Sequence, residues 1–182
     1  MGYGLRVITG PTSEPVSIAE VRQHCRIDAT DDDAGIARRI LAARTYVEQV
    51  TERAIPVQTL EITMDDFPVG TIELPRAPVA SVTSIKYTDA NGAQQTVSAS
   101  DYVLDSSTVL PRVALAFGKS WPATQQTAGN VIIRFVAGED QAPEPIRQAI
   151  LVLVAAWDEN RAAFDPIPGV DALLAPYRAC WL

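Results

Sequence analysis

The chain has 182 residues, of which 47% are hydrophobic, and it carries a formal net charge of −7. This length and composition suit one large globular domain or two small ones with a sizeable core. Its only lysines are Lys86 and Lys119, and the arginines are scattered along the sequence. Because DNA-binding proteins present clustered cations to the phosphates, tight and direct binding to duplex DNA is not expected.

The sequence also argues against a membrane protein, a secreted protein and a metalloprotein. It has no run of about 18 apolar residues, and its first ten residues lack the basic start and apolar stretch of a signal peptide. We therefore expect a cytoplasmic protein. Cys25 and Cys180 lie far apart without histidines at ligand spacing, so both are expected to be packing thiols. A disulfide would require the terminal helices to meet at these residues, and a reducing cytosol argues against it.

The N-terminal quarter predicts an extended arm followed by two helices. Residues 1–16 alternate loosely and are interrupted by prolines. Ser17 and Glu20 form a capping-box pattern, with Val16 and Val21 placed as a hydrophobic staple, so a helix is expected from Ser17 to about residue 27. A second helix is expected from 30–33 to residue 53, with Thr30 as N-cap and three aspartates at its positive end. Its apolar stripe comprises Ile36, Ile40, Ala43, Val47 and Val50.

The middle of the chain predicts short strands and tight turns. Alternation indicates strands at 60–64, 72–74, 82–87, 95–97, 102–104, 112–116 and 131–136. Asp89-Ala90-Asn91-Gly92 is typical of a β-hairpin turn, because Asn and Gly tolerate positive φ. The segment from Pro75 to Pro78 cannot belong to a central strand, because proline lacks the backbone donor.

The C-terminal segment again predicts helix. Pro145 suits a first helical position, and a wide apolar face follows at Ile146, Ile150, Leu153, Val154 and Trp157. A helix is expected over 145–161, and a short one over 170–178 that Pro176 bends or ends. We therefore predict an α+β fold in which the N- and C-terminal helices pack together around an inserted, mainly antiparallel β block. The predicted domains are a discontinuous helical domain, 1–56 and 143–182, and a β domain, 57–142.

None of the candidate catalytic patterns is convincing. Asp31-Asp32-Asp33 lacks the alternating ligands and glycine turn of a calcium loop and fits a helix N-terminus better. Asp65-Asp66 precedes a turn. Asp105, Ser107 and His24 supply the residue types of a hydrolase triad, but no nucleophile elbow accompanies them. A phosphate-binding glycine loop is absent, and an acidic linker between the first two helices disfavours a helix-turn-helix.

Several stretches together resemble a known family. They are, in order, Pro15–Val21; Leu74–Tyr87 with the turn Asp89–Gly92; Gly118–Pro122 with Val131–Gly138; and Pro143–Ile150 with Leu174–Arg178. Their order and spacing resemble the phage head-to-tail connector proteins, also called head-completion adaptors, over nearly the whole chain. One departure is the stretch after Arg161, which is shorter than in many relatives.

This resemblance implies a structural protein without catalytic residues, metal or cofactor. It implies a ring, typically of twelve subunits, that lies below the portal of a phage, prophage or gene transfer agent particle and docks the tail. The implied partners are further copies of the chain, the portal protein and a tail or head-closure protein, with DNA passing through the ring without specific binding. Assembly in the bacterial cytoplasm and residence in the particle are implied, with no membrane contact.

The surfaces expected to make these contacts are the charged face of the second helix, the hairpin Tyr87–Val97 and the segment Val170–Leu182. Candidate contact residues are Arg38, Arg39, Arg44, Trp121, Tyr177, Arg178, Trp181 and Leu182. For the three helix arginines, ordinary solvated charges are an equally good interpretation. Two other functions stay open at this point: a small enzyme or enzyme subunit with an unrecognised site, and a DNA-binding regulator.

Overall fold

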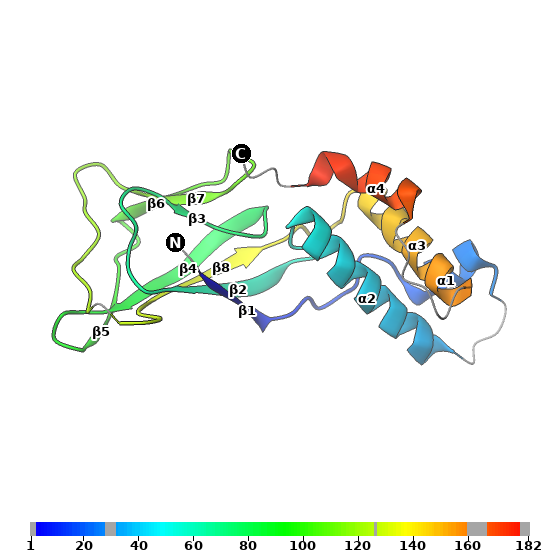
Figure 1. The fold of residues 1–182 in the computed structure, drawn as a ribbon, viewed down its shortest axis with the longest axis horizontal. Coiled ribbons are helices and arrows are strands. Elements are labelled where there is room, and N and C mark those ends of the chain that lie inside the picture. Colours follow the sequence, from blue (N-terminus) through cyan, green and yellow to red (C-terminus); the bar gives the residue numbers. More distant parts are fainter. Residues whose placement is uncertain (1–2, 28–31, 126, 160–166, 179–182) are drawn as a thin grey trace. The chain divides into compact units, whose positions relative to one another are not determined.

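The chain forms two compact units in a computed structural model that describes residues 3–27, 32–125, 127–159 and 167–178. One unit comprises Met1–Gly10 and Val57–Gly138, and the other comprises Pro11–Pro56 and Glu139–Leu182. The first contains the strands and the second the helices (Figure 1). This mixture of helices and antiparallel sheets confirms the predicted α+β class.

The helical unit is built around its most apolar helix. Its elements are α1 (Ile18–Cys25), α2 (Asp33–Thr51), α3 (Glu144–Glu159), α4 (Pro168–Leu174) and the 3₁₀ turn η1 (Ala175–Tyr177). Helix α3 contacts α1, α2 and α4. The buried cluster joins the predicted stripe of α2, from Ile36 to Val47, with the apolar face of α3, from Ile146 to Val154. The terminal helices therefore pack together as predicted.

Local signals placed the helix starts well. The Ser17 hydroxyl accepts from the Glu20 backbone N–H at 3.2 Å, and the Glu20 carboxylate accepts from the Ser17 N–H at 2.8 Å. Val16 and Val21 are both buried in the core cluster, as the predicted staple requires. The N-cap of α2 is Asp32 rather than Thr30. Residues 28–31 themselves lie outside the described residues.

The β unit contains two antiparallel sheets. The five-stranded sheet has the order β1-β2-β8-β4-β5. Its strands are β1 (Gly4–Thr9), β2 (Gln58–Met64), β4 (Val79–Thr88), β5 (Gln94–Thr96) and β8 (Val131–Ala137). The second sheet, β3-β7-β6, joins β3 (Ile72–Glu73), β7 (Arg112–Leu115) and β6 (Tyr102–Asp105).

One face of the five-stranded sheet is buried and the other is polar. Along β2 and β8, alternate residues such as Leu60, Ile62, Ile133 and Phe135 are nearly inaccessible to solvent. The intervening residues, with the exception of Glu61, are only partly buried. This alternation is the pattern of an antiparallel sheet that packs on one side only.

Part of the N-terminal segment, which was expected to be an extended arm, is an extended strand of the five-stranded sheet. Residues Gly4–Thr9 pair with β2, placing Leu5 opposite Ile62 and Arg6 opposite Glu61. The sequence pattern of this segment does not reveal its pairing partner, because β2 lies more than fifty residues away along the chain. The predicted hairpin is present: Gly92 has φ +84°, and Asp89 accepts from the backbone N–H of Asn91 and Ala93.

Candidate assembly surfaces

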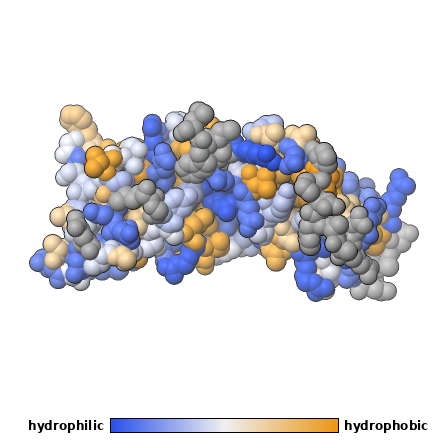
Figure 2. Space-filling model, in the orientation of Figure 1, coloured by the Kyte–Doolittle hydropathy of each residue, from blue (hydrophilic) through white to orange (hydrophobic). Residues whose placement is uncertain are grey.

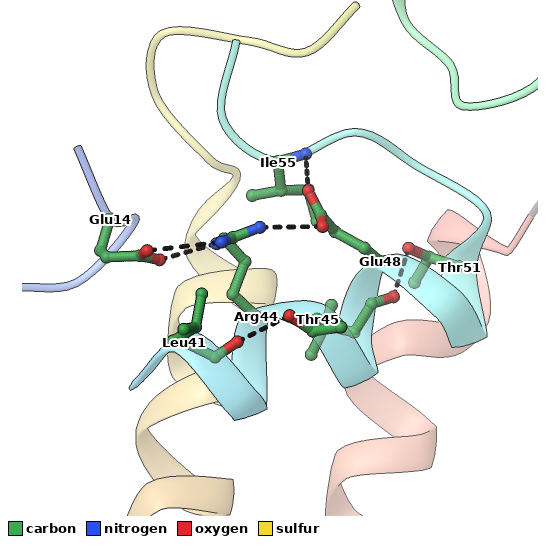
Figure 3. Close-up of polar contacts among 8 residues, drawn as sticks. Glu14, Leu41, Arg44, Thr45, Glu48, Thr51 and Ile55 are labelled. Atoms are coloured by element: carbon green, nitrogen blue, oxygen red, sulfur yellow. Dashed lines mark hydrogen bonds and ion pairs between the residues drawn. The ribbon is translucent and has the colours of Figure 1, made fainter. Parts of the chain in front are cut away.

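The three candidate arginines of α2 have different environments, and Arg44 is the most enclosed. Only 7% of Arg44 is exposed. Its Nε donates to Glu14 at 2.7 Å and its Nη1 to Glu48 at 2.9 Å (Figure 3). The second oxygen of Glu48 accepts from the Ile55 N–H at 2.8 Å. Arg44 thus holds together segments of its own subunit and has little surface to offer a neighbour.

This network lies within the helical unit, close in sequence to two of the places where the chain passes from one unit to the other. Glu14 follows the boundary at Gly10, and Ile55 precedes the boundary at Pro56. Near the third boundary, at Gly138, Arg53 donates to Glu139 at 2.6 Å. Each crossing therefore lies beside an ion pair or a charge-assisted hydrogen bond within the helical unit, and such bonds are stronger than neutral ones.

Arg39 and Arg38 behave in opposite ways. Arg39 is paired with Asp32 at 3.0 Å and with Asp158 at 3.1 Å, so it joins α2 to α3. Arg38 is exposed and forms no ion pair with any described residue. It lies on the same exposed side of α2 as Leu41, which is 47% exposed. Of the three arginines, Arg38 is therefore the one whose charge no described residue balances.

The candidates near the C-terminus belong to the helical unit. The Arg53 guanidinium lies 6.0 Å from the centre of the Tyr177 ring, and Arg178 pairs with Asp171 at 2.7 Å. Both candidates remain partly exposed. Trp181 and Leu182 lie outside the described residues. The structure thus places Tyr177 and Arg178 close together in the short segment that follows α4.

Trp121 braces two loops of the β unit. Its indole N–H donates to the Gly70 carbonyl at 3.1 Å, and its ring stacks on Phe67 with centroids 4.8 Å apart. These loops also carry Val69 and Phe117, whose side chains are fully exposed. Figure 2 shows separate hydrophobic patches among hydrophilic side chains on the visible face. Braced loops that expose large apolar groups are suited to bind another protein surface.

The polar face of the five-stranded sheet collects cations that are distant in sequence. The register places Arg6 opposite Glu61 and Glu61 opposite Arg134, while Lys86 lies opposite Ile132 on the same face. Glu61 is nearly buried between the two arginines, which approach it at 3.4 and 2.8 Å. Sequence reasoning missed this surface, because its only signal is a strand pairing that the sequence does not display.

The alternative catalytic patterns are explained by loop structure. Asp65 accepts from the Gly129 N–H at 2.8 Å, and Asp66 accepts from the Thr124 hydroxyl at 2.7 Å. The Ser107 hydroxyl and N–H lower the pKa of Asp105, with Arg112 adding to the effect, so this carboxylate is a charged turn residue. His24 belongs to the other unit.

Among the described residues, no group of three or more His, Cys, Asp or Glu side chains is arranged to hold a metal ion. No helix in that part of the chain is long and apolar enough to cross a membrane.

Comparison with known proteins identifies the family. The model of the Head completion protein family matches residues 14–164. The chain belongs to the head completion protein family. The match to the family model confirms the predicted family. No curated protein sequence matches the chain significantly.

Three solved structures resemble this head completion protein over 98% of its length. A chain in the neck of an empty gene transfer agent (GTA) particle, computed with C6 symmetry, is 29% identical with a TM-score of 0.84 over 97% of that chain. A chain in the virion of a native GTA particle is 28% identical, with a TM-score of 0.81 over 96% of that chain. A third, in the neck of a native GTA particle computed with C12 symmetry, is 26% identical, with a TM-score of 0.81 over 97%. The protein is a structural head-to-tail connector.

Proposed function

We propose that this head completion protein forms a ring below the portal of a phage, prophage or gene transfer agent particle and provides the surface on which the tail docks. Its partners are further copies of itself, the portal protein and a tail or head-closure protein. The ring contains twelve subunits, assembles in the bacterial cytoplasm and remains in the particle. DNA passes through it without specific binding, and the role requires neither catalysis nor a cofactor.

The observation that carries this proposal is the likeness over 98% of the chain to chains in necks computed with C6 and C12 symmetry. A rotational axis of this kind relates several copies of each chain. Subunits in a closed ring make heterologous contacts, in which one surface of a protomer meets a different surface of the next. The distinct exposed surfaces of this connector supply what such contacts require.

Three surfaces are proposed as contacts with neighbouring subunits or the portal. The first is the exposed side of α2 with Arg38 and Leu41. The second is the surface after α4 with Tyr177 and Arg178. Trp181 and Leu182, which lie outside the described residues, are proposed as further contacts. The third comprises the loops braced by Trp121. Arg39 and Arg44 support the first surface by fixing α2 to the rest of its unit.

The test is to produce the connector together with the portal protein of the same particle and to determine the mass of the complex by native mass spectrometry. The expected result is a portal complex that carries a closed ring of connector subunits, with twelve copies visible by electron microscopy. A connector that stays monomeric in the presence of an assembled portal would contradict the proposal.

Arg38→Glu tests the first surface. We expect it to weaken ring formation, because it reverses an unpaired and exposed charge. Arg26→Glu is its matched control, since Arg26 is also exposed and forms no ion pair with any described residue. If both variants form rings equally well, the exposed side of α2 is not part of the interface between subunits.

A further inference from the structure

The cations gathered on the five-stranded sheet form a surface with an unusual charge for this protein. We define the basic sheet face as the polar side of that sheet carrying Arg6, Lys86, Arg134 and Glu61. Arg6 and Arg134 have exposed side-chain fractions of 70% and 43%, and Lys86 is exposed. The single carboxylate, Glu61, is only 7% exposed. The groups accessible to a partner on this face are therefore positive.

The charge balance of the face is opposite to that of the whole chain. Three cations and one carboxylate give the face a charge of +2, whereas the chain carries −7. The rest of the molecule has 12 Lys and Arg residues and 21 Asp and Glu residues, which gives it a charge of −9. The rest of the surface of a second copy is thus acidic on average, which is complementary to the basic sheet face.

The local hydrogen bonds leave donors available on this face. Arg134 donates to one oxygen of Glu61 through Nε at 3.2 Å and Nη2 at 2.8 Å. Arg6 approaches the other oxygen at 3.4 Å. Among the described residues, no bond involves Arg134 Nη1 or Lys86 Nζ. These donors are free to bind carboxylates of another molecule.

We propose that the basic sheet face binds an acidic surface of the adjacent copy of this connector and forms one half of the head-to-tail subunit contact. The inference rests on the proposed ring and names a surface within it. A heterologous contact needs two different and complementary surfaces on each subunit. A small positive face on an otherwise acidic molecule meets this requirement, and it disfavours contacts between two identical faces.

The composition of the face favours a protein partner over DNA. Glu61 lies between the two arginines and would oppose a phosphate group there. Ile132 and Val136 are partly buried side chains of the same face, and aliphatic groups of this kind suit a protein surface. Three cations are also fewer than the phosphate contacts that give DNA-binding proteins their affinity.

The experiment compares two double variants of the full chain in ring assembly with the portal protein. Arg6→Gln/Lys86→Gln removes two cations of the basic sheet face and leaves the bonds between Arg134 and Glu61 in place. Arg26→Gln/Arg112→Gln is the matched control. It removes two exposed arginines that lie outside the basic sheet face and outside the other proposed contact surfaces.

We expect the first double variant to assemble about tenfold more weakly than the wild type, with a reduced dependence on salt. The control should assemble like the wild type. Circular dichroism checks that both variants are folded. Equal assembly by both would overturn the inference while leaving the ring intact, whereas a wild-type connector that forms no ring on the portal would overturn the proposed function as well.

Duplex DNA serves as the competing occupant in a second measurement. Fluorescence anisotropy with a labelled duplex at low salt is expected to show no binding to the basic sheet face. Salt-dependent binding by the wild type that is lost in Arg6→Gln/Lys86→Gln, without an effect on assembly, would overturn the inference in favour of a DNA-contacting face.

Discussion

Replacing Arg44 by methionine tests whether the buried ion network stabilises the helical unit. Methionine fills much of the space of the arginine stem and removes only the charge and the donors. Breaking a buried ion pair costs about 3–5 kcal/mol, because the remaining buried charge loses the opposite charge that balanced it. Glu48 is 12% exposed and keeps the hydrogen bond from the Ile55 N–H but loses the guanidinium, while Glu14, at 33%, regains some hydration. We therefore expect a loss of about 3 kcal/mol in the free energy of unfolding.

A loss of this size lowers Tm by about 6–12 °C in a protein of this length. The assay is thermal and urea unfolding followed by the helical circular dichroism signal, which reports on the unit that contains α1 to α4. Two units can unfold separately, so the strand signal is fitted as a second transition. A destabilisation below about 1 kcal/mol would refute the argument that the pair is buried and structural.

The double variant Arg44→Met/Glu48→Gln separates charge from packing. The glutamine carbonyl can still accept from the Ile55 N–H, and it leaves no buried charge behind. We expect the double variant to be about 1–2 kcal/mol more stable than Arg44→Met alone. If the two substitutions instead add their separate effects, the loss in Arg44→Met does not come from the Glu48 charge that has lost its arginine.

Four further outcomes are expected from the local structure. Ser17→Ala removes the capping hydroxyl and should lower the free energy of unfolding by about 1 kcal/mol in urea titrations. Hydrogen bonds from the backbone and side chain of Ser17, and then Arg147, hold the pKa of Glu20 below 4.5. Its contribution to stability is thus present above pH 4.5 and lost as pH falls through the lowered pKa, so Glu20→Gln should show a shallower acid loss. Trp121→Phe keeps the ring stack but loses the bond to Gly70, and should cost about 1 kcal/mol with faster amide exchange in both loops. Burial, then Asp158 and Glu159, raise the pKa of Cys25 above 9.0, so its alkylation in a variant lacking the other cysteine should still be accelerating at that pH.

The helices were predictable because their signals are local. The capping box of α1 involves residues three apart, and the stripe of α2 repeats at spacings of three and four. Both patterns depend on helix geometry alone. The Asp89 turn was equally clear, because it requires only one residue that tolerates positive φ. Such features can therefore be recognised from a short stretch of sequence without knowledge of the tertiary contacts.

The basic sheet face was not predictable for the opposite reason. Arg6 and Glu61 are separated by more than fifty residues, and Glu61 and Arg134 by 73. Their meeting depends on the pairing of β1 with β2 and of β2 with β8. A slip of one residue in either register would move each side chain to the other face of the sheet. The electrostatics of this surface are therefore a property of topology rather than of composition.

The three arginines of α2 show how far helix geometry alone can rank contact residues. Arg39 follows Ile36 by three positions and Arg44 follows Ile40 by four, so both flank the buried stripe and find carboxylates of their own unit. Arg38 lies three positions before the exposed Leu41 and points away from the core. Reversing the charge of Arg38 should therefore change assembly with little change in stability, whereas removing Arg44 should change stability first. If the Arg38 and Arg44 substitutions had the same effects on assembly and on stability, this expectation would be wrong. The position of an arginine relative to the buried stripe of α2 would then not determine whether it contacts a neighbouring subunit or stabilises its own.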